Sequence, residues 1–183
     1  MAILDGLPGV EIAVVVDGRD LHEYQDSDTA NKEDTVTKYI EAVDGANFAV
    51  KIKVTKDFEF KGDFLCTQVR IDGTLVSYTA ITPADAQAGA YDYHADSIRV
   101  NDESKRRLKF KVLETVSEDD AGVSDNKERV QNLGKIEIWV NHENKLGLDT
   151  STSNYERPVV DEGAISEKDV KGKAITHTYR YST

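Results

Sequence analysis

Apolar and polar residues alternate along most of this chain, with the period of two that is typical of strands and not the 3.6 of a helix. The clearest segment is Phe48–Val54, in which every second residue is apolar and two of the residues between are lysines. Such alternation predicts half-buried strands in an antiparallel arrangement. We expect further strands at Val10–Val16, 35–43, 65–71, 75–79, 97–100, 107–113, 135–140 and 174–181.

Turn and cap signals separate these segments. Asp17-Gly18 and Asp72-Gly73 each follow an alternating run, and Asp-Gly accepts the positive φ that a two-residue hairpin turn requires. Capping residues predict two short helices, over 124–133 and over 166–172, each ending at a glycine. We therefore predict an all-β fold, an antiparallel β-sandwich that is jelly-roll-like or C2-like, with one or two short helices, as a single domain over residues 1–183.

Charge narrows the range of partners. The chain has 183 residues, enough for a core without disulfides, and 34 acidic against 23 basic residues give it a net charge of −11. This balance disfavours a nucleic-acid backbone or an anionic membrane as a partner of the whole surface. Any contact with an anion then requires a local basic patch. We expect no membrane association, and nucleic acid is not the favoured partner.

Cysteine usage and the first residues of the chain indicate a compartment. Cys66 is the single cysteine, so the chain has no internal disulfide, and it contains no Asn-x-Ser/Thr glycosylation acceptor. The start has no basic region followed by an apolar run of signal-peptide length. We expect a cytoplasmic or nuclear protein.

Three segments together resemble a large fungal family whose members share an N-terminal domain of unknown function. They are Gly6-Leu7-Pro8-Gly9-Val10-Glu11-Ile12 running into Val14-Val15-Val16-Asp17-Gly18, then Thr35-Val36-Thr37-Lys38-Tyr39-Ile40-Glu41-Ala42, and Ile165-Ser166-Glu167-Lys168-Asp169-Val170-Lys171-Gly172-Lys173-Ala174-Ile175-Thr176-His177. The resemblance spans nearly the whole chain. It implies no established activity.

Enzymatic signatures are sparse. The sequence contains no Gly-x-Ser-x-Gly elbow, no phosphate-binding Gly-rich loop, no dinucleotide fingerprint and no His-Glu-x-x-His. Cys66 with one of the histidines could form a catalytic pair assembled from distant loops, but a half-buried strand thiol is the simpler interpretation. The acidic run from Asp17 to Asp34 matches no twelve-residue calcium loop. We expect no catalytic residue, no metal and no cofactor.

The strongest local signal is a run of basic residues within a predicted strand. Five of the seven positions from Lys105 to Lys111 are basic, and strand alternation places Arg107, Lys109 and Lys111 opposite Leu108 and Phe110. We call Arg106, Arg107, Lys109 and Lys111 the basic stripe. It would bind an anionic partner, or its side chains pair across the strands with acids of this chain, which is the simpler alternative.

Trp139 is the second signal, because it shares its predicted strand face with Lys135 and Glu137. If uncovered, it is a candidate anchor for a partner or a sugar ring; otherwise one of the short helices covers it. Together these signals favour an intracellular, non-enzymatic interaction module with a protein partner, of acidic character, bound at the basic stripe and Trp139. The alternatives are a self-assembling acidic sandwich of the histone-chaperone type, hence a homo-oligomer, or the enzyme described above.

Overall fold

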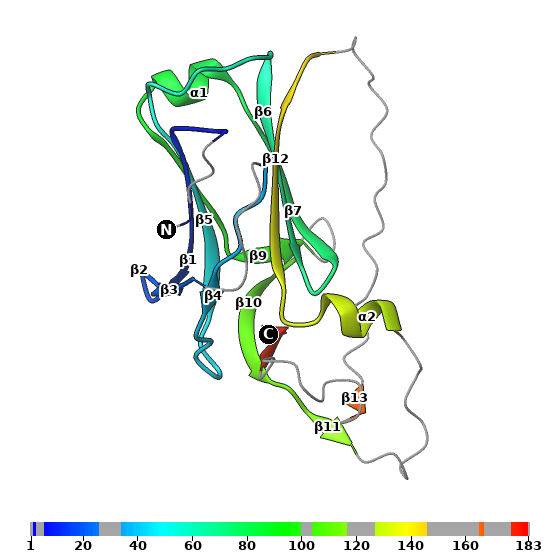
Figure 1. Ribbon diagram of the computed structural model, residues 1–183. Coiled ribbons are helices and arrows are strands. Elements are labelled where there is room, and N and C mark those ends of the chain that lie inside the picture. The colour runs from blue at the N-terminus through cyan, green and yellow to red at the C-terminus, as the bar shows by residue number, and fades with distance from the viewer. Residues whose placement is uncertain are drawn as a thin grey trace.

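The computed structural model describes residues 2, 6–25, 34–99, 104–116, 127–145, 165–166 and 177–182. Its main sheets are antiparallel and form two facing layers, as the all-β sandwich prediction requires (Figure 1). One layer has the strand order β2 (Arg19–Asp20), β1 (Val10–Val16), β5 (Phe48–Val54), β8 (Tyr91–Ala95). The other has the order β12 (Ile136–Glu143), β6 (Phe64–Ile71), β7 (Thr74–Ile81).

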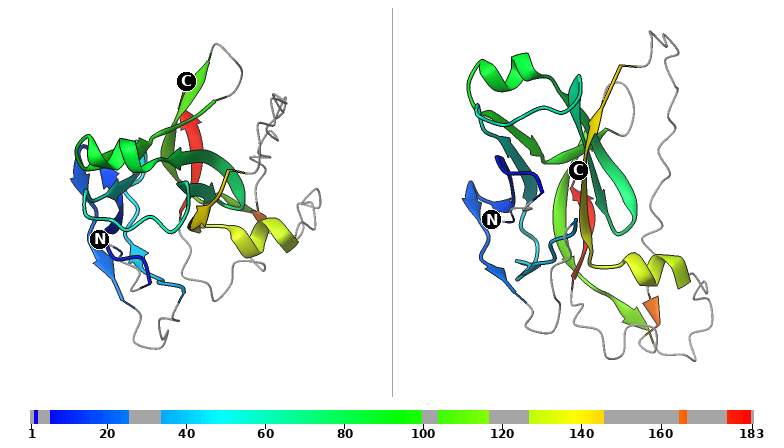
Figure 2. Two further views of the ribbon diagram at one scale, coloured as in Figure 1. Left: turned by 90° about the horizontal axis from the view of Figure 1, so that it is seen from above. Right: turned by 45° about the horizontal axis from the view of Figure 1, so that its top comes forward.

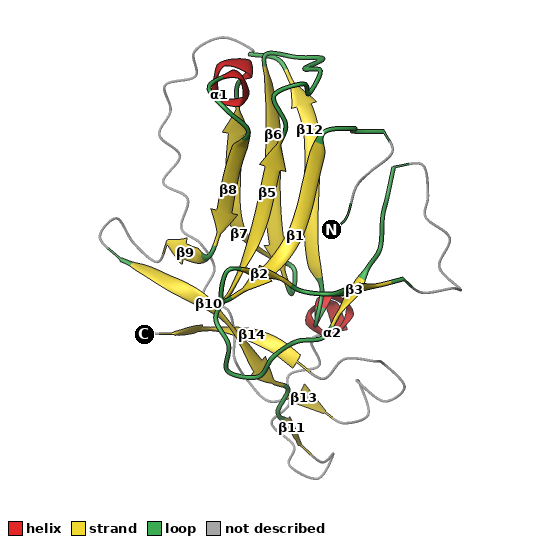
Figure 3. Cartoon of the chain, turned by 90° about the vertical axis from the view of Figure 1, so that its left-hand side faces the viewer, coloured by secondary structure: helices red, strands yellow, loops and turns green. Residues whose placement is uncertain are grey.

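A third sheet lies below these layers, in the order β14 (His177–Ser182), β10 (Lys105–Val112), β9 (Ser97–Arg99) (Figure 3). Two small pairs complete the strands: β3 (Glu23–Tyr24) with β4 (Tyr39–Ile40), and β11 (Thr115–Val116) with β13 (Ile165–Ser166). The helices are α1 (Pro83–Gln87) and α2 (Lys127–Asn132). Neither is long and apolar enough to cross a membrane, and the described part of the chain contains no other helix.

The core fills the space between the layers, which Figure 2 shows from above. Alternation places the even-numbered apolar residues of β5 on its inner side, where Val50, Ile52 and Val54 are fully buried. They pack against the inner side of the opposite layer, for example Val69 and Leu65 in β6. The third sheet contributes Leu108 and Phe110 to the same core.

Both Asp-Gly turns form as predicted. Asp17 and Gly18 have φ of 49° and 74°, and Asp72 and Gly73 have φ of 49° and 81°. Each pair connects two antiparallel strands through a two-residue loop, the geometry in which both central residues need positive φ. The second turn also anchors the start of β12, because Asp72 Oδ1 accepts a hydrogen bond from the Gly134 N–H at 2.6 Å.

The sequence prediction was wrong in some places. Of the strand expected over 35–43, only Tyr39–Ile40 is a strand, and it pairs only with β3. Ile40 and Ala42 pack against the core while Tyr39 and Val43 are exposed, so the segment does bury one face, but among the described strands only the two residues of β3 pair with it. Helix α1 was not predicted, although Thr82 and Asp85 form a reciprocal capping box.

The two helices expected over 124–133 and 166–172 lie only partly within the described residues. Helix α2 ends as expected before Gly134, whose φ is 70°, and Leu133 is buried, but the expected cap at Ser124 lies outside the described residues. Ser166 is the last residue of β13, and the rest of the expected helix over 166–172 also lies outside the described residues.

Candidate functional site: a basic face on β10

Strand β10 is held between two neighbours. It pairs with β14 along one edge, and along the other with β9 and with the segment 44–47. The Phe110 N–H donates to the Ala46 carbonyl at 3.0 Å, and the Gly45 N–H donates to the Phe110 carbonyl at 3.1 Å. On the inner side, Phe110 stacks on Phe48 with ring centroids 4.1 Å apart. The backbone of β10 is therefore fixed on both edges, so its outward side chains have defined positions.

The outward side of β10 carries four cations at alternate positions. Lys105 and Arg107 are exposed, whereas Lys109 and Lys111 are half-buried. Lys111 Nζ forms an ion pair with Glu114 Oε1 at 2.9 Å, within its own segment of chain. The stem of Lys109 lies over Gly45, because its Cε is 3.8 Å from the position of an added Cβ there. Lys105 and Arg107 have no ion pair within the part of the chain that the structure describes.

Arg106 differs from the rest of the basic stripe. It lies opposite Ile98, on the same side of β10 as Leu108 and Phe110, and it is exposed because it stands near the end of the strand. Three residues of the predicted stripe, Arg107, Lys109 and Lys111, lie on the outward side of β10. Lys105 lies on the same side.

The sequence suggested that these side chains pair with acids on neighbouring strands, but in the described part of the chain no acid lies directly opposite the outward side of β10. Residues directly opposite each other in an antiparallel pair lie on the same face of the sheet. Among the described pairings, no outward position of β10 has an Asp or Glu as its register partner: Lys105 pairs with Arg99, Arg107 with Ser97 and Ser182, Lys109 with Arg180 and Asn47, and Lys111 with Thr178. We call Arg99, Lys105, Arg107, Lys109, Lys111 and Arg180 the basic face; Arg180 is assigned by register position alone.

Sequence reasoning missed Arg99 and Arg180. Arg99 belongs to a strand of three residues, and Arg180 lies more than sixty residues beyond the stripe. Both become part of the basic face only through strand pairing. Basic residues at alternate positions of a predicted strand were the only signal available, and nothing in it indicated which strands would lie beside β10.

The chain matches a known domain family over nearly its whole length. Residues 9–183 match a domain family described as a domain of unknown function, DUF7918. This chain belongs to the DUF7918 family. No curated protein and no solved structure matches it. The function of this DUF7918 domain must therefore be argued from its own residues.

Trp139 lies on a different sheet of the DUF7918 domain. It points away from the core on β12, with 55% of its surface exposed, so α2 does not cover it. No strand pairing joins β12 to β10, and the structure does not bring Trp139 together with the basic face. The two predicted binding features are separate surfaces.

The candidate nucleophile of the DUF7918 domain is a poor one. Cys66 is 1% exposed, and burial raises the pKa of its thiol. The thiolate is the reactive form, so a raised pKa makes the sulfur unreactive at neutral pH. In the acidic segment, Asp20 pairs with Lys51, and Asp26 and Asp28 lie outside the described residues. Within the described ranges, no group of three His, Cys, Asp or Glu side chains could hold a metal ion.

Proposed function

We propose that this DUF7918 domain is an interaction module that docks an acidic protein segment on its basic face. The observation that carries the proposal is the register of β10, which places Lys105 opposite Arg99 and Lys109 opposite Arg180. Like charges directly opposite each other in a sheet are destabilising. A bound anion would remove this repulsion and accept charge-assisted hydrogen bonds from the same side chains.

The many acidic residues of the chain make the arginines opposite β10 stronger support for a binding surface. With 34 acidic residues available, acids could have stood opposite these bases, as Glu11 stands opposite Lys53 in β5. The outward side of β10 instead has one carboxylate partner in the described residues, Glu114, which binds only Lys111. Lys105 and Arg107 therefore remain available to a partner.

The chemistry favours an acidic protein segment over nucleic acid. Single-stranded nucleic acid is bound by cations together with aromatic side chains on which bases stack. The outward positions of β10 are all lysine or arginine. Duplex DNA has about one charge per 1.7 Å, so a protein of net charge −11 repels it strongly, whereas a short acidic segment is repelled less. The row of alternate cations along β10 also matches an extended peptide in shape.

The test measures binding of a labelled peptide of alternating Glu and Ser residues by fluorescence anisotropy. Lys105→Glu/Arg107→Glu is the decisive variant, because both side chains are exposed and neither forms an ion pair with another described residue. We expect at least about tenfold weaker binding, with a smaller dependence on salt concentration. Lys56→Glu/Lys145→Glu is the matched control, since it changes the net charge equally at exposed sites away from β10.

Three outcomes would overturn the proposal. The first is wild-type protein that does not bind the peptide at low salt. The second is an equal loss of binding in the control variant, which would show that only the net charge matters. The third is tighter binding to a duplex DNA oligonucleotide or to phosphoinositide vesicles than to the peptide, which would assign the basic face to another class of partner.

A further inference from the structure

The outward face of the sheet β12-β6-β7 presents two aromatic rings with an amide between them. The register places Trp139, Gln68 and Tyr78 directly opposite one another, one residue on each strand. Trp139 is 55% and Tyr78 is 51% exposed. Neighbouring strands are about 4.8 Å apart, so these two residues lie about 10 Å apart across the sheet. This aromatic row, Trp139, Gln68 and Tyr78, ends at an edge strand on each side, since no described strand pairs with β12 or β7 beyond it.

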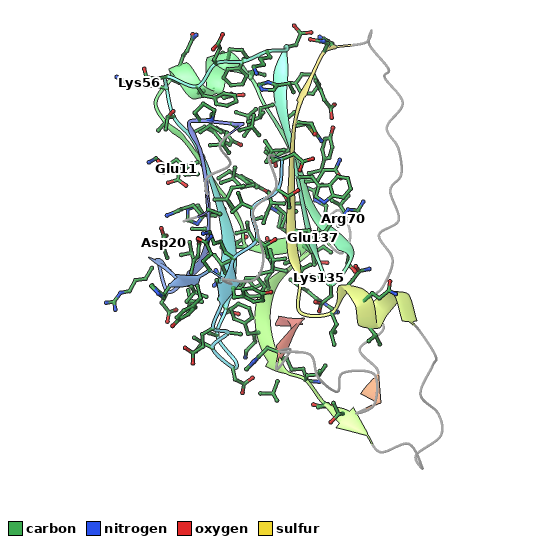
Figure 4. All side chains as sticks on the ribbon, in the orientation of Figure 1. Glu11, Asp20, Lys56, Arg70, Lys135 and Glu137 are labelled. Carbon is green, nitrogen blue, oxygen red and sulfur yellow. The ribbon has the colours of Figure 1, made fainter. Side chains whose placement is uncertain are left out.

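The neighbouring rows mix polar and apolar side chains. On one side Glu137 lies opposite Arg70, which lies opposite Leu75, and on the other Asn141 lies opposite Cys66, which lies opposite Ala80. Figure 4 labels Arg70, Lys135 and Glu137 beside β12, on the side of the molecule away from Glu11 and Asp20. Among the described outward residues of these strands, together with Lys135 just before β12, the cations Arg70 and Lys135 equal in number the carboxylates Glu137 and Glu143. The face is therefore polar without a net charge, unlike the basic face of β10.

The Tyr78 side chain is held in place by a buried residue of the neighbouring strand. Its hydroxyl interacts with the Cys66 thiol through a hydrogen bond, which is the main reason that the pKa of Tyr78 is raised to about 12. Cys66 itself is buried in the central strand of the sheet. A ring tied to a buried group in this way loses little conformational entropy when a ligand covers it.

We propose that the aromatic row is a binding site for an extended chain of neutral sugars, independent of the acidic-peptide site. The apolar C–H face of a pyranose ring packs on an aromatic ring, while its hydroxyls require hydrogen-bond partners close by. Trp139 and Tyr78 supply two such rings at a spacing comparable to a disaccharide unit. Gln68, Asn141 and the Arg70–Glu137 row supply donors and acceptors around them. Since no described strand pairs beyond either edge, a polymer can continue past the sheet on both sides.

A protein partner suits this face less well. Protein interfaces concentrate their binding energy in a contiguous, desolvated apolar centre. Here an amide separates the two rings, and the next rows place the polar Glu137, Arg70 and Asn141 beside Leu75, Cys66 and Ala80. A charged polymer would gain nothing from a face whose charges balance.

The wild-type protein provides a direct readout, because Trp139 is its only tryptophan. Fluorescence is recorded while the protein is titrated with hydroxyethyl cellulose, laminarin, glucomannan or glycogen. We expect a saturable change in Trp139 emission with at least one of them. Native gels that contain the same polysaccharide test the variants, whose charge is unchanged. Trp139→Ala should lose the retardation, and Tyr78→Ala should weaken it at least about tenfold. Tyr39→Ala removes an exposed aromatic on β4 and should bind as the wild type does.

Several results would overturn the sugar site. One is the absence of any emission change or retardation with all four polysaccharides. Another is retardation that Trp139→Ala leaves intact. A third is sedimentation of the wild type as a dimer that Trp139→Ala converts to a monomer, which would assign the aromatic row to a second copy of this chain. None of these results bears on peptide binding at the basic face, so the two proposals fail separately.

Discussion

Strands β5 and β10 have similar sequences but different surroundings. Each buries one face in the same core and carries cations at alternate positions on the other. In β5 the cations are neutralised across the strands, because Lys53 Nζ lies 2.9 Å from Glu11 Oε2 and Lys51 pairs with Asp20. In β10 the described register partners of the outward positions include no Asp or Glu, and two of them are arginines.

The difference shows that alternation determines which side of a strand is buried, but not the use of the exposed side. An outward lysine that faces a carboxylate is part of the sheet's own electrostatics. An outward lysine that faces an arginine raises the energy of the free protein and is available to an external anion. The same residue type therefore has a structural role in one strand and a proposed binding role in the other.

The inner faces of the two strands should be equivalent, and this is the largest effect we predict. Ile52 in β5 and Leu108 in β10 are both fully buried. Replacing either with Ala should lower the free energy of unfolding by about 2 to 5 kcal/mol, since each leaves a cavity in the core. Urea denaturation measures the loss. Val43→Ala, at an exposed site, should change stability by less than about 0.5 kcal/mol. A loss that small at Leu108 would show that β10 does not share the core.

The outer faces should respond in opposite ways to charge reversal. Lys53→Glu places a carboxylate directly opposite Glu11 and should destabilise the protein by about 0.5 to 1 kcal/mol. Lys105→Glu places a carboxylate opposite Arg99 and should leave the melting temperature unchanged or raise it. Thermal melts of both variants at low salt make the comparison. Equal destabilisation by the two changes would show that β10 is neutralised as β5 is.

Lowering the pH should reduce the stability of the fold without weakening peptide binding at the basic face. We expect this effect to be smaller than those of the substitutions above. His142 Nδ1 accepts a hydrogen bond from the Lys61 N–H at 3.2 Å, and its ring stacks on Phe58. Burial, and secondarily the charge of Lys61, lower the pKa of His142. The unfolded chain therefore binds a proton more readily than the folded one. The stability that neutral His142 contributes is present above the ordinary histidine pKa of about 6.5 and is lost as pH falls through the lowered, folded-state value.

His142→Asn is the matched variant for this test, because its side chain can still accept a hydrogen bond but does not titrate. Urea denaturation at pH 7.5 and 5.5 should show a smaller loss of stability in the variant than in the wild type. The lysines and arginines of the basic face stay charged at both pH values. Peptide binding by the folded protein should therefore be the same at both. An equal pH dependence in both proteins would contradict the role of His142.

Much of the fold could be predicted from local patterns. The segments Val10–Val16 and Phe48–Val54 alternate strictly and form β1 and β5, and Asp72-Gly73 forms the expected hairpin turn. The strand β8 was not predicted, because Tyr91 and Tyr93 alternate with polar residues over only five positions. The strand expected over 35–43 was wrong in length because alternation buries Ile40 and Ala42 but does not supply a strand to pair with, and β3 pairs with only two residues.

The sequence by itself determined which residues of each long strand face inward, because a period of two fixes the two sides of a strand wherever the strand lies. It also determined the hairpin turns, since few dipeptides tolerate positive φ. Only the tertiary structure decided that Arg99 and Arg180 stand beside the stripe on β10, and that Gln68 and Tyr78 complete a row with Trp139. These groupings depend on which strands pair and in which register, and pairing joins residues far apart along the chain. No local pattern contains that information, so the sequence indicated the basic stripe and Trp139, but the residues that complete both candidate surfaces of this DUF7918 domain became visible only in the folded protein.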